Sequence, residues 1–173
     1  IGGELSKLIA ASGIKGLTSN PSIFEKAILQ SGAYEEALNT LAAGADGAAE
    51  IYEALAVEDI QRAADVFRPT YDASGGTDGF VSMEVSPRLA RDAAATEFEA
   101  ERLFNRIDRK NAMIKVPATR EGLAAGLTLL KKGVNVNFTL IFSAKRYEKT
   151  ARTYLEAMVW RRNTRYSRVN ARS

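Results

Sequence analysis

Short runs rich in apolar residues predict four β-strands in this 173-residue chain. The segments between them are longer, and their apolar residues recur every three or four positions, as on one face of an amphipathic helix. The expected strands are residues 14–20, 80–85 and 134–142, and a segment around Lys115. Strands that alternate with helices, with no hairpin turn between them, indicate a parallel sheet and an α/β fold.

Capping residues mark the ends of the expected helices. Ser86-Pro87, Thr119 and Ser143 are favourable helix starts, because Ser and Thr side chains accept hydrogen bonds from the first free N–H groups. Glycines and Pro69 are the expected stops. The helices are predicted over residues 4–11, 21–41, 48–67, 86–107, 123–132 and from 144 onward. The last helix is expected to turn Tyr147, Ala151, Tyr154 and Leu155 inward.

Polar residues alternate with apolar ones on all four strands, although strands covered on both faces are usually apolar throughout. Strand geometry places these polar side chains on one face, near the carboxyl ends of the strands. Parallel α/β barrels keep their active sites at that end. A structural alternative is a hydrogen-bonded network that only fixes strand register. The polar positions are Thr18 and Asn20, Ser82 and Glu84, Lys115, and Asn135, Asn137 and Thr139.

Lys115 is the residue with the most specific chemistry in this set. Burial disfavours the ammonium form of a lysine, and a neutral amine attacks carbonyl carbon to form a Schiff base. The alternative is a lysine that extends its amine to solvent. The expected site would suit a polyhydroxylated carbonyl compound such as a sugar. It would combine a carbonyl-reactive amine, a carboxylate acting directly or through water, and amide and hydroxyl groups.

Composition removes several classes of chemistry. The chain has no cysteine and no histidine. Disulfides, Cys/His zinc sites and nucleophile–histidine pairs are therefore excluded, and proton transfer must rely on carboxylates, lysine, tyrosine or water. Neither glycine-rich nucleotide-binding motif is present, which argues against a doubly wound nucleotide-binding fold. No apolar run approaches the ~20 residues that a membrane-spanning helix needs, so no membrane partner is expected.

Net charge is concentrated at one end. Five of the 24 basic residues lie between residues 161 and 172, a stretch without acids, so the rest carries 19 basic against 21 acidic residues. A mildly acidic body with a short basic end is not typical of a nucleic-acid-binding protein. A non-catalytic chain whose arginine-rich end binds an acidic partner is the alternative from a different functional class.

Four segments resemble signature segments of the transaldolase family, in the family's order and spacing. They are GLTSNPSIF at residues 16–24, VSMEVSP at 81–87, IKVPATREG at 114–122 and NVNFTLIFS at 135–143. The match extends from about residue 4 to residue 155 and is similar to the longer bacterial transaldolases. The short fructose-6-phosphate aldolases have a different pattern on the strand after the lysine.

This resemblance implies a (β/α)8 barrel of the pentose phosphate pathway, located in the cytoplasm. The enzyme would transfer a dihydroxyacetone unit from sedoheptulose 7-phosphate to glyceraldehyde 3-phosphate, with no metal or organic cofactor. Lys115 would form the imine, and Glu84 and Thr139 would hold the water that moves protons. Asn20 and Asn137 would bind substrate hydroxyls, with Thr18 and Ser19 as further substrate-binding candidates. The resemblance leaves open assembly into a homo-oligomer.

Only four of the eight barrel strands have counterparts here. The first family strand, with its aspartate, would precede residue 1, and the strands with a serine and the phosphate-binding arginines would follow the last match. We therefore expect a partial barrel domain over residues 1–158 and a basic segment over residues 159–173. The resemblance leaves open whether this part of the enzyme is active by itself. A half-barrel completed by a second copy and a fructose-6-phosphate aldolase are the remaining alternatives.

Overall fold

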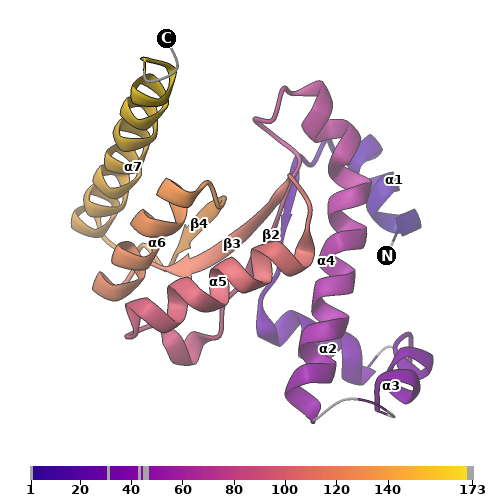
Figure 1. The fold of residues 1–173 in the computed structure, drawn as a ribbon. Coiled ribbons are helices and arrows are strands. Elements are labelled where there is room, and N and C mark those ends of the chain that lie inside the picture. The colour runs from indigo at the N-terminus through magenta and orange to yellow at the C-terminus, as the bar shows by residue number, and fades with distance from the viewer. Residues whose placement is uncertain (1, 31, 43, 45–46, 171–173) are drawn as a thin grey trace. The chain divides into compact units, whose positions relative to one another are not determined.

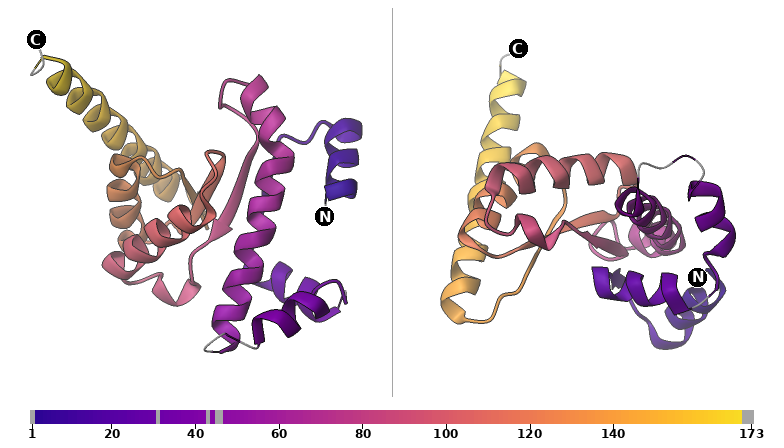
Figure 2. Two further views of the ribbon diagram at one scale, coloured as in Figure 1. Left: turned by 45° about the vertical axis from the view of Figure 1, so that its right-hand side comes forward. Right: turned by 90° about the horizontal axis from the view of Figure 1, so that it is seen from below.

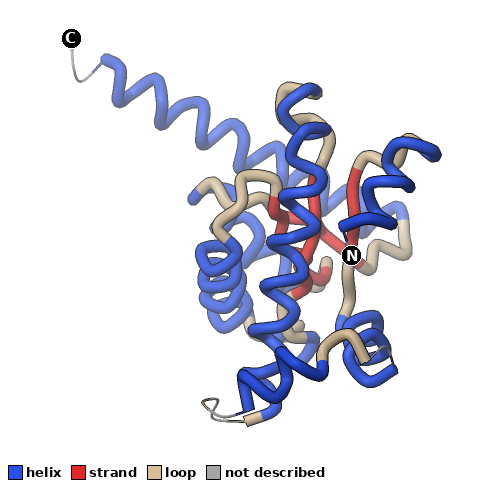
Figure 3. The backbone as a smooth tube through the Cα atoms, turned by 90° about the vertical axis from the view of Figure 1, so that its right-hand side faces the viewer, coloured by secondary structure: helices blue, strands red, loops and turns tan. Residues whose placement is uncertain are grey.

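A computed structural model describes residues 2–30, 32–42, 44 and 47–170. The chain forms two compact units. Unit 1 comprises residues 1–84 and 105–112, and unit 2 comprises residues 85–104 and 113–173. Strands and helices alternate along the described chain, as the colouring in Figure 3 shows.

Unit 1 is built around a long helix, α4, which packs against strand β2 and helices α1 and α3 (Figure 1). Strands β1 and β2 pair in parallel, with Leu17 opposite Val81. One side of α4 is buried at three- and four-residue spacing, including Leu55, Ile60 and Phe67. Figure 2 shows α1 lying beside α4. The elements of unit 1 are α1 (Gly2–Ser12), β1 (Gly16–Thr18), α2 (Pro21–Gln30), α3 (Glu35–Ala42), α4 (Ala48–Ala73) and β2 (Phe80–Glu84).

Helix α4 is longer than predicted, because Pro69 lies inside the helix and does not end it. Proline removes one backbone hydrogen bond, a loss that packing in the same turn can offset. Here Tyr71 makes an edge-to-face contact with Phe80 of β2, with ring centroids 5.3 Å apart. The helix ends at Ala73, and the N–H of the capping residue Ser74 donates to the Thr70 carbonyl. Tertiary packing thus overrides the local helix-breaking signal.

Unit 2 contains the second parallel pair, β3 and β4, with α6 packed on β4 and α7 packed on α6. The expected helix over 86–107 is instead a 3-10 turn followed by a separate helix, α5, whose last residues belong to unit 1. Asp92 caps α5 by accepting from the N–H of Ala95 at 2.9 Å, so Ser86 does not start it. The elements are the 3-10 turn Pro87–Leu89, α5 (Ala93–Ile107), β3 (Ala112–Pro117), α6 (Arg120–Lys132), β4 (Val136–Thr139) and α7 (Ala144–Asn170).

Two predicted strands are shorter than expected. Strand β1 has three residues, and all three are exposed. Strand β4 ends at Thr139 because Leu140 adopts a left-handed backbone conformation with φ of +63°, which breaks the extended chain. The apolar run from Leu140 to Phe142 was therefore misinterpreted as strand, and both of these end residues are exposed.

Helix α7 turns a different face inward than predicted. Tyr147, Tyr154 and Leu155 are each at least half exposed, whereas Thr150 and Ala157 are buried. Small side chains on that side allow α6 to approach closely, and the Lys131–Glu156 ion pair of 3.2 Å joins the two helices. The large apolar side chains of α7 contribute little to the core that the described chain builds. The helix also continues without a break past residue 158.

The predicted Thr119 cap is confirmed, although α6 begins at Arg120, three residues earlier than expected, and the cap explains the glycine of the IKVPATREG segment. Thr119 accepts a hydrogen bond from the Gly122 N–H at 2.9 Å, and its own hydroxyl donates to the Ala90 carbonyl at 2.6 Å. A Cβ atom on Gly122 would lie 1.9 Å from the backbone oxygen of Pro117. Only glycine lets the first turn of α6 lie this close to the end of β3.

We expect Gly122→Ala to lower the free energy of unfolding by about 3 kcal/mol, the upper end of the usual cost of overpacking, because the clashing atom is backbone. This reverses the usual gain of about 1 kcal/mol for Gly→Ala in a helix. Urea unfolding followed by circular dichroism measures the change. Gly3→Ala is the matched control, since a Cβ at Gly3 of α1 meets no atom within 4 Å. Equal urea midpoints for the two variants would contradict the close approach of α6 to the end of β3.

Candidate active site

The predicted site residues belong to two groups, one in each unit. The group in unit 1 consists of Thr18, Ser19, Asn20 and Glu84. The group in unit 2 consists of Lys115, Asn137 and Thr139. The meeting of all seven in one cavity stays a prediction.

Asn20 holds the start of α2. Its Oδ1 accepts a hydrogen bond from the N–H of Ile23 at 2.9 Å, the geometry of a helix N-cap. Because a backbone N–H can only donate, this bond fixes the orientation of the amide, and the two Nδ2 hydrogens point away from the cap. Asn20 therefore combines a structural role for its oxygen with donors for a ligand.

The neighbouring residues of the β1 end differ in exposure. Ser19 is buried, and its hydroxyl donates to the Ser82 carbonyl at 2.9 Å. The Ser19 N–H also donates to that carbonyl, at 3.1 Å, which ties the β1 end to β2. Thr18 is exposed. The structure thus gives Ser19 a supporting role beside the binding role that the resemblance implies.

Glu84 and Asn20 line a small cavity in unit 1. Its volume is about 10 Å³, and Glu84, the last residue of β2, is half-buried in its wall. Sequence reasoning missed one polar side chain here, Tyr52 of α4. Tyr52 lies within a helical run of apolar spacing, and nothing in that local pattern separates it from a core aromatic. The cavity is lined by Ser19, Asn20, Pro21, Phe24, Tyr52, Met83 and Glu84.

The phenol of Tyr52 is held in its protonated form. Burial raises the pKa of Tyr52, and the nearby carboxylates of Glu84 and Glu25 raise it further. A phenol is already protonated at neutral pH, and the nearby negative charges extend this hydrogen-bond-donating form to higher pH.

Strand register brings Lys115 and Asn137 together in unit 2. They are directly paired on the parallel strands β3 and β4, and Pro117 pairs with Thr139 one step further along. Neighbouring strands lie about 4.8 Å apart, and paired residues point to the same face. Lys115, Asn137 and Thr139 are all half-buried. An amine, an amide and a hydroxyl thus share one face at the carboxyl end of this pair.

This face is the one turned away from α6. A Cβ atom on Gly126 of α6 would lie 2.3 Å from the ring of Phe138, so Phe138 points toward α6. Asn137 and Thr139 alternate with Phe138 and therefore point to the opposite side. On β3, Ile114 and Val116 are fully buried, whereas Lys115 between them is not. The alternation predicted from the sequence is confirmed on both strands.

Backbone hydrogen bonds anchor β3 along its length. In unit 2 the Lys115 carbonyl accepts from the Val85 N–H at 3.2 Å, and the Thr139 carbonyl accepts from the Ala118 N–H at 2.8 Å. In unit 1 the N–H of Val81 donates to the Asn111 carbonyl at 2.9 Å. The backbone of the lysine strand is therefore held on both of its edges.

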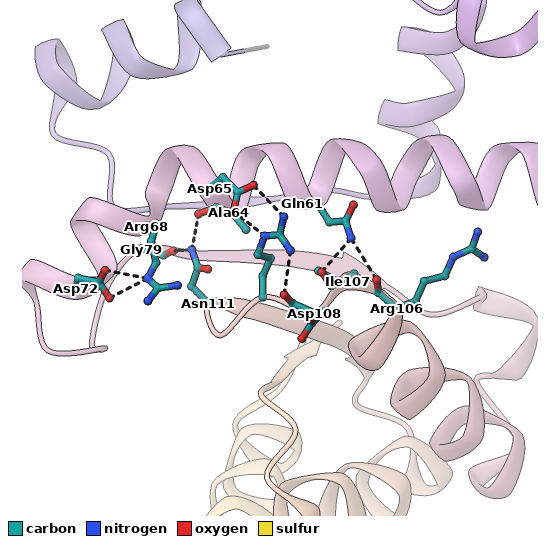
Figure 4. A network of polar contacts seen from close by, with 11 residues as sticks. Gln61, Ala64, Asp65, Arg68, Asp72, Gly79, Arg106, Ile107, Asp108 and Asn111 are labelled. Carbon is teal, nitrogen blue, oxygen red and sulfur yellow. Dashed lines mark hydrogen bonds and ion pairs between the residues drawn. The ribbon is translucent and has the colours of Figure 1, made fainter. Parts of the chain in front are cut away.

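Figure 4 shows a polar network that fixes α4 in unit 1. The Asn111 side chain donates to the carbonyls of Ala64 and Gly79, both at 2.8 Å. Gln61 donates to two carbonyls at the end of α5, and Arg109 forms a two-point ion pair with Asp65. The network holds the helix that carries Tyr52.

No group of three or more acidic side chains in the described part of the chain is placed to hold a metal ion. No helix within it combines the length and apolar character needed to cross a membrane.

Parallel strands followed by helices, with polar side chains at the strand ends, define the chain as part of an α/β protein. A family model described as Transaldolase/Fructose-6-phosphate aldolase matches residues 3–166. The chain therefore belongs to the transaldolase/fructose-6-phosphate aldolase family. The predicted fold class, four of the strand–helix units of a (β/α)8 barrel, is confirmed.

Curated relatives carry the name transaldolase. The chain is 44% identical to the transaldolase of Trichodesmium erythraeum and 47% identical to transaldolase 1 of Streptomyces coelicolor, each over 156 residues. It is 43% identical to the transaldolase of Thiobacillus denitrificans. Each match covers 90% of this chain but 41 to 44% of the relative. The chain thus spans about two-fifths of the length of the curated relatives it matches.

Proposed function

We propose that this chain supplies the imine-forming part of a transaldolase, which transfers a dihydroxyacetone unit from sedoheptulose 7-phosphate to glyceraldehyde 3-phosphate. The observation that carries the proposal is the register pairing of Lys115 with Asn137 on one face of β3 and β4. An amine beside an amide donor suits a ketose. The amine can attack the carbonyl carbon, and the amide N–H can donate a hydrogen bond to a neighbouring hydroxyl. Family membership supports the same assignment.

The roles proposed for the other residues follow from the chemistry of an imine. A Schiff base on Lys115 accepts electrons when the adjacent carbon–carbon bond breaks. Protons must then move without histidine, and we assign this to a water held by Glu84 and Thr139. Asn20 and Asn137 would bind hydroxyls of the three-carbon unit, with Thr18 and Ser19 beside them. The proposal includes a place in the cytoplasmic pentose phosphate pathway and requires no cofactor.

An aldolase that cleaves fructose 6-phosphate is the second candidate, and the joint name of the family supports keeping it. The two reactions share the imine and differ in the fate of the three-carbon unit. A transaldolase retains this unit on lysine until an aldose acceptor arrives, whereas an aldolase releases it as free dihydroxyacetone.

The test is sodium borohydride reduction of the chain after incubation with sedoheptulose 7-phosphate, followed by peptide mass mapping. We expect a reduced three-carbon adduct on Lys115, because reduction fixes the imine left after carbon–carbon cleavage. Prior addition of glyceraldehyde 3-phosphate should decrease this adduct. Free dihydroxyacetone accumulating without acceptor would favour the aldolase, and absence of any adduct on Lys115 would count against both.

A further inference from the structure

We propose that the Tyr52 hydroxyl is a further ligand-binding group, which donates a hydrogen bond to the sugar hydroxyl or water that enters the cavity beside Asn20 and Glu84. The inference rests on the proposed function, because it adds a residue to the site that would bind the three-carbon unit. It concerns a residue of α4, outside the strand ends that supply the other candidates.

The Tyr52 ring has two distinct surroundings in unit 1. Phe24 contacts it edge to face, with centroids 6.2 Å apart and an interplanar angle of 89°. On another side the ring borders a groove of about 260 Å³, formed by α2, α3 and α4 and lined by apolar atoms. The surface of this groove offers a hydroxyl almost no polar atoms to bind. The cavity shared with Asn20 and Glu84 is the polar environment that the ring also borders.

The size of that cavity limits which part of a ligand can enter it. A volume of about 10 Å³ accommodates roughly one water-sized group. A single hydroxyl or water oxygen fits, and a whole sugar does not. The remainder of any ligand must lie outside this cavity.

The polar atoms around the cavity match the hydrogen-bonding capacity of one hydroxyl. A hydroxyl accepts two hydrogen bonds and donates one. Asn20 offers the N–H groups of Nδ2, since its Oδ1 is used by the α2 cap. Tyr52 offers a phenol O–H, and its raised pKa keeps this donor well away from ionisation. Glu84 offers a carboxylate acceptor, which completes a set of two donors and one acceptor.

The position of Tyr52 is rigid enough for such a role. Phe24 packs edge to face against its ring, and α4 is tied through Asn111 to the loop before β2 and to the residues that precede β3 (Figure 4). A side chain held in this way loses little conformational entropy when a ligand binds, because the ring is already ordered.

Tyr52→Phe tests the inference, since it removes the hydroxyl and keeps the ring. We expect the dihydroxyacetone concentration that gives half-maximal borohydride trapping to rise about 5-fold, the effect of one lost hydrogen bond. Tyr71→Phe is the matched control, because Tyr71 lies on the same helix and makes the same kind of ring contact, with Phe80. It should leave half-saturation unchanged. Urea midpoints of both variants should match the parent chain.

A second measurement separates this inference from the proposed function. In chain carrying ¹³Cζ-labelled tyrosine, with Tyr52 assigned by its absence in Tyr52→Phe, dihydroxyacetone should shift the Tyr52 signal saturably. Glu84→Gln should lower the Tyr52 pKa, because a negative charge that raises it is gone. A saturable shift without trapping would refute the imine chemistry and support the Tyr52 contact. If the chain is trapped but the Tyr52 signal does not shift and Tyr52→Phe is trapped like the parent chain, only the Tyr52 contact is overturned. If neither trapping nor a signal shift occurs, the imine chemistry and the Tyr52 contact are both overturned.

Discussion

Lys115→Arg should reduce borohydride-dependent labelling by dihydroxyacetone to background, while the chain stays folded. Arginine keeps the positive charge and most of the length of lysine, but its guanidinium does not deprotonate in proteins and cannot form an imine. Lys115 is half-buried and points away from the face of Ile114 and Val116, so the substitution leaves the buried face of β3 unchanged. The expected effect is therefore a loss of chemistry without a loss of structure.

Intact-mass measurement after reduction, with peptide mapping, gives the result directly. Lys145→Arg is the control, because Lys145 is an exposed lysine at the start of α7. That variant should label as the parent chain does. Undiminished labelling of Lys115→Arg at other lysines would show that the adduct reflects general amine reactivity, and the proposed role of Lys115 would then be wrong.

Asn111→Asp should destabilise the chain by about 3–5 kcal/mol at pH 7, the usual cost of an uncompensated buried charge. Asn111 is fully buried, and its Nδ2 donates to the carbonyls of Ala64 and Gly79 (Figure 4). A carboxylate there would face two acceptor oxygens with no donor to offer. Since small domains have only about 5–15 kcal/mol of stability in total, this single atom exchange would remove a large share.

The loss should be smaller in acid. Two facing carbonyls disfavour the carboxylate, so the substituted acid would have a folded-state pKa above its unfolded value. The folded state then binds more protons, and stability falls as pH rises through that window. Urea unfolding at pH 4 and pH 7 measures the difference. Asn105→Asp is the control on an exposed residue of the α5 end, with an expected cost below about 1 kcal/mol from the helix dipole. Similar losses for both variants would contradict the role of Asn111.

The two capping residues of α6 and the two-faced strands β3 and β4 were predictable from the sequence because local rules govern them. Thr119 caps α6 through its own hydroxyl, and Gly133 ends the helix with a left-handed conformation. Ile114 and Val116 alternate with Lys115, and strand geometry alone sends these side chains to opposite faces. The candidates Lys115, Asn137 and Thr139 were found by this alternation.

Other features depended on contacts between segments far apart in the chain. Pro69 was expected to end a helix, but α4 runs through it to Ala73, and Tyr71 beyond the proline packs against Phe80 of β2. Ser86 and Asp92 are both good caps by residue type, and the structure uses Asp92 for α5. Tyr147 and Tyr154 had the spacing of a core face, yet α6 packs on the side with the smaller residues.

The sequence by itself determined the order of strands and helices, the faces of β3 and β4, and the family, because period, caps and motif residues are local properties of the chain. Only the tertiary structure decided that Tyr52 of α4 borders the same cavity as Asn20 and Glu84. The reason is physical: the local sequence around a helical tyrosine is the same whether its hydroxyl lies near a carboxylate or its ring packs only against apolar side chains. That difference arises when residues about 30 positions apart are brought into contact.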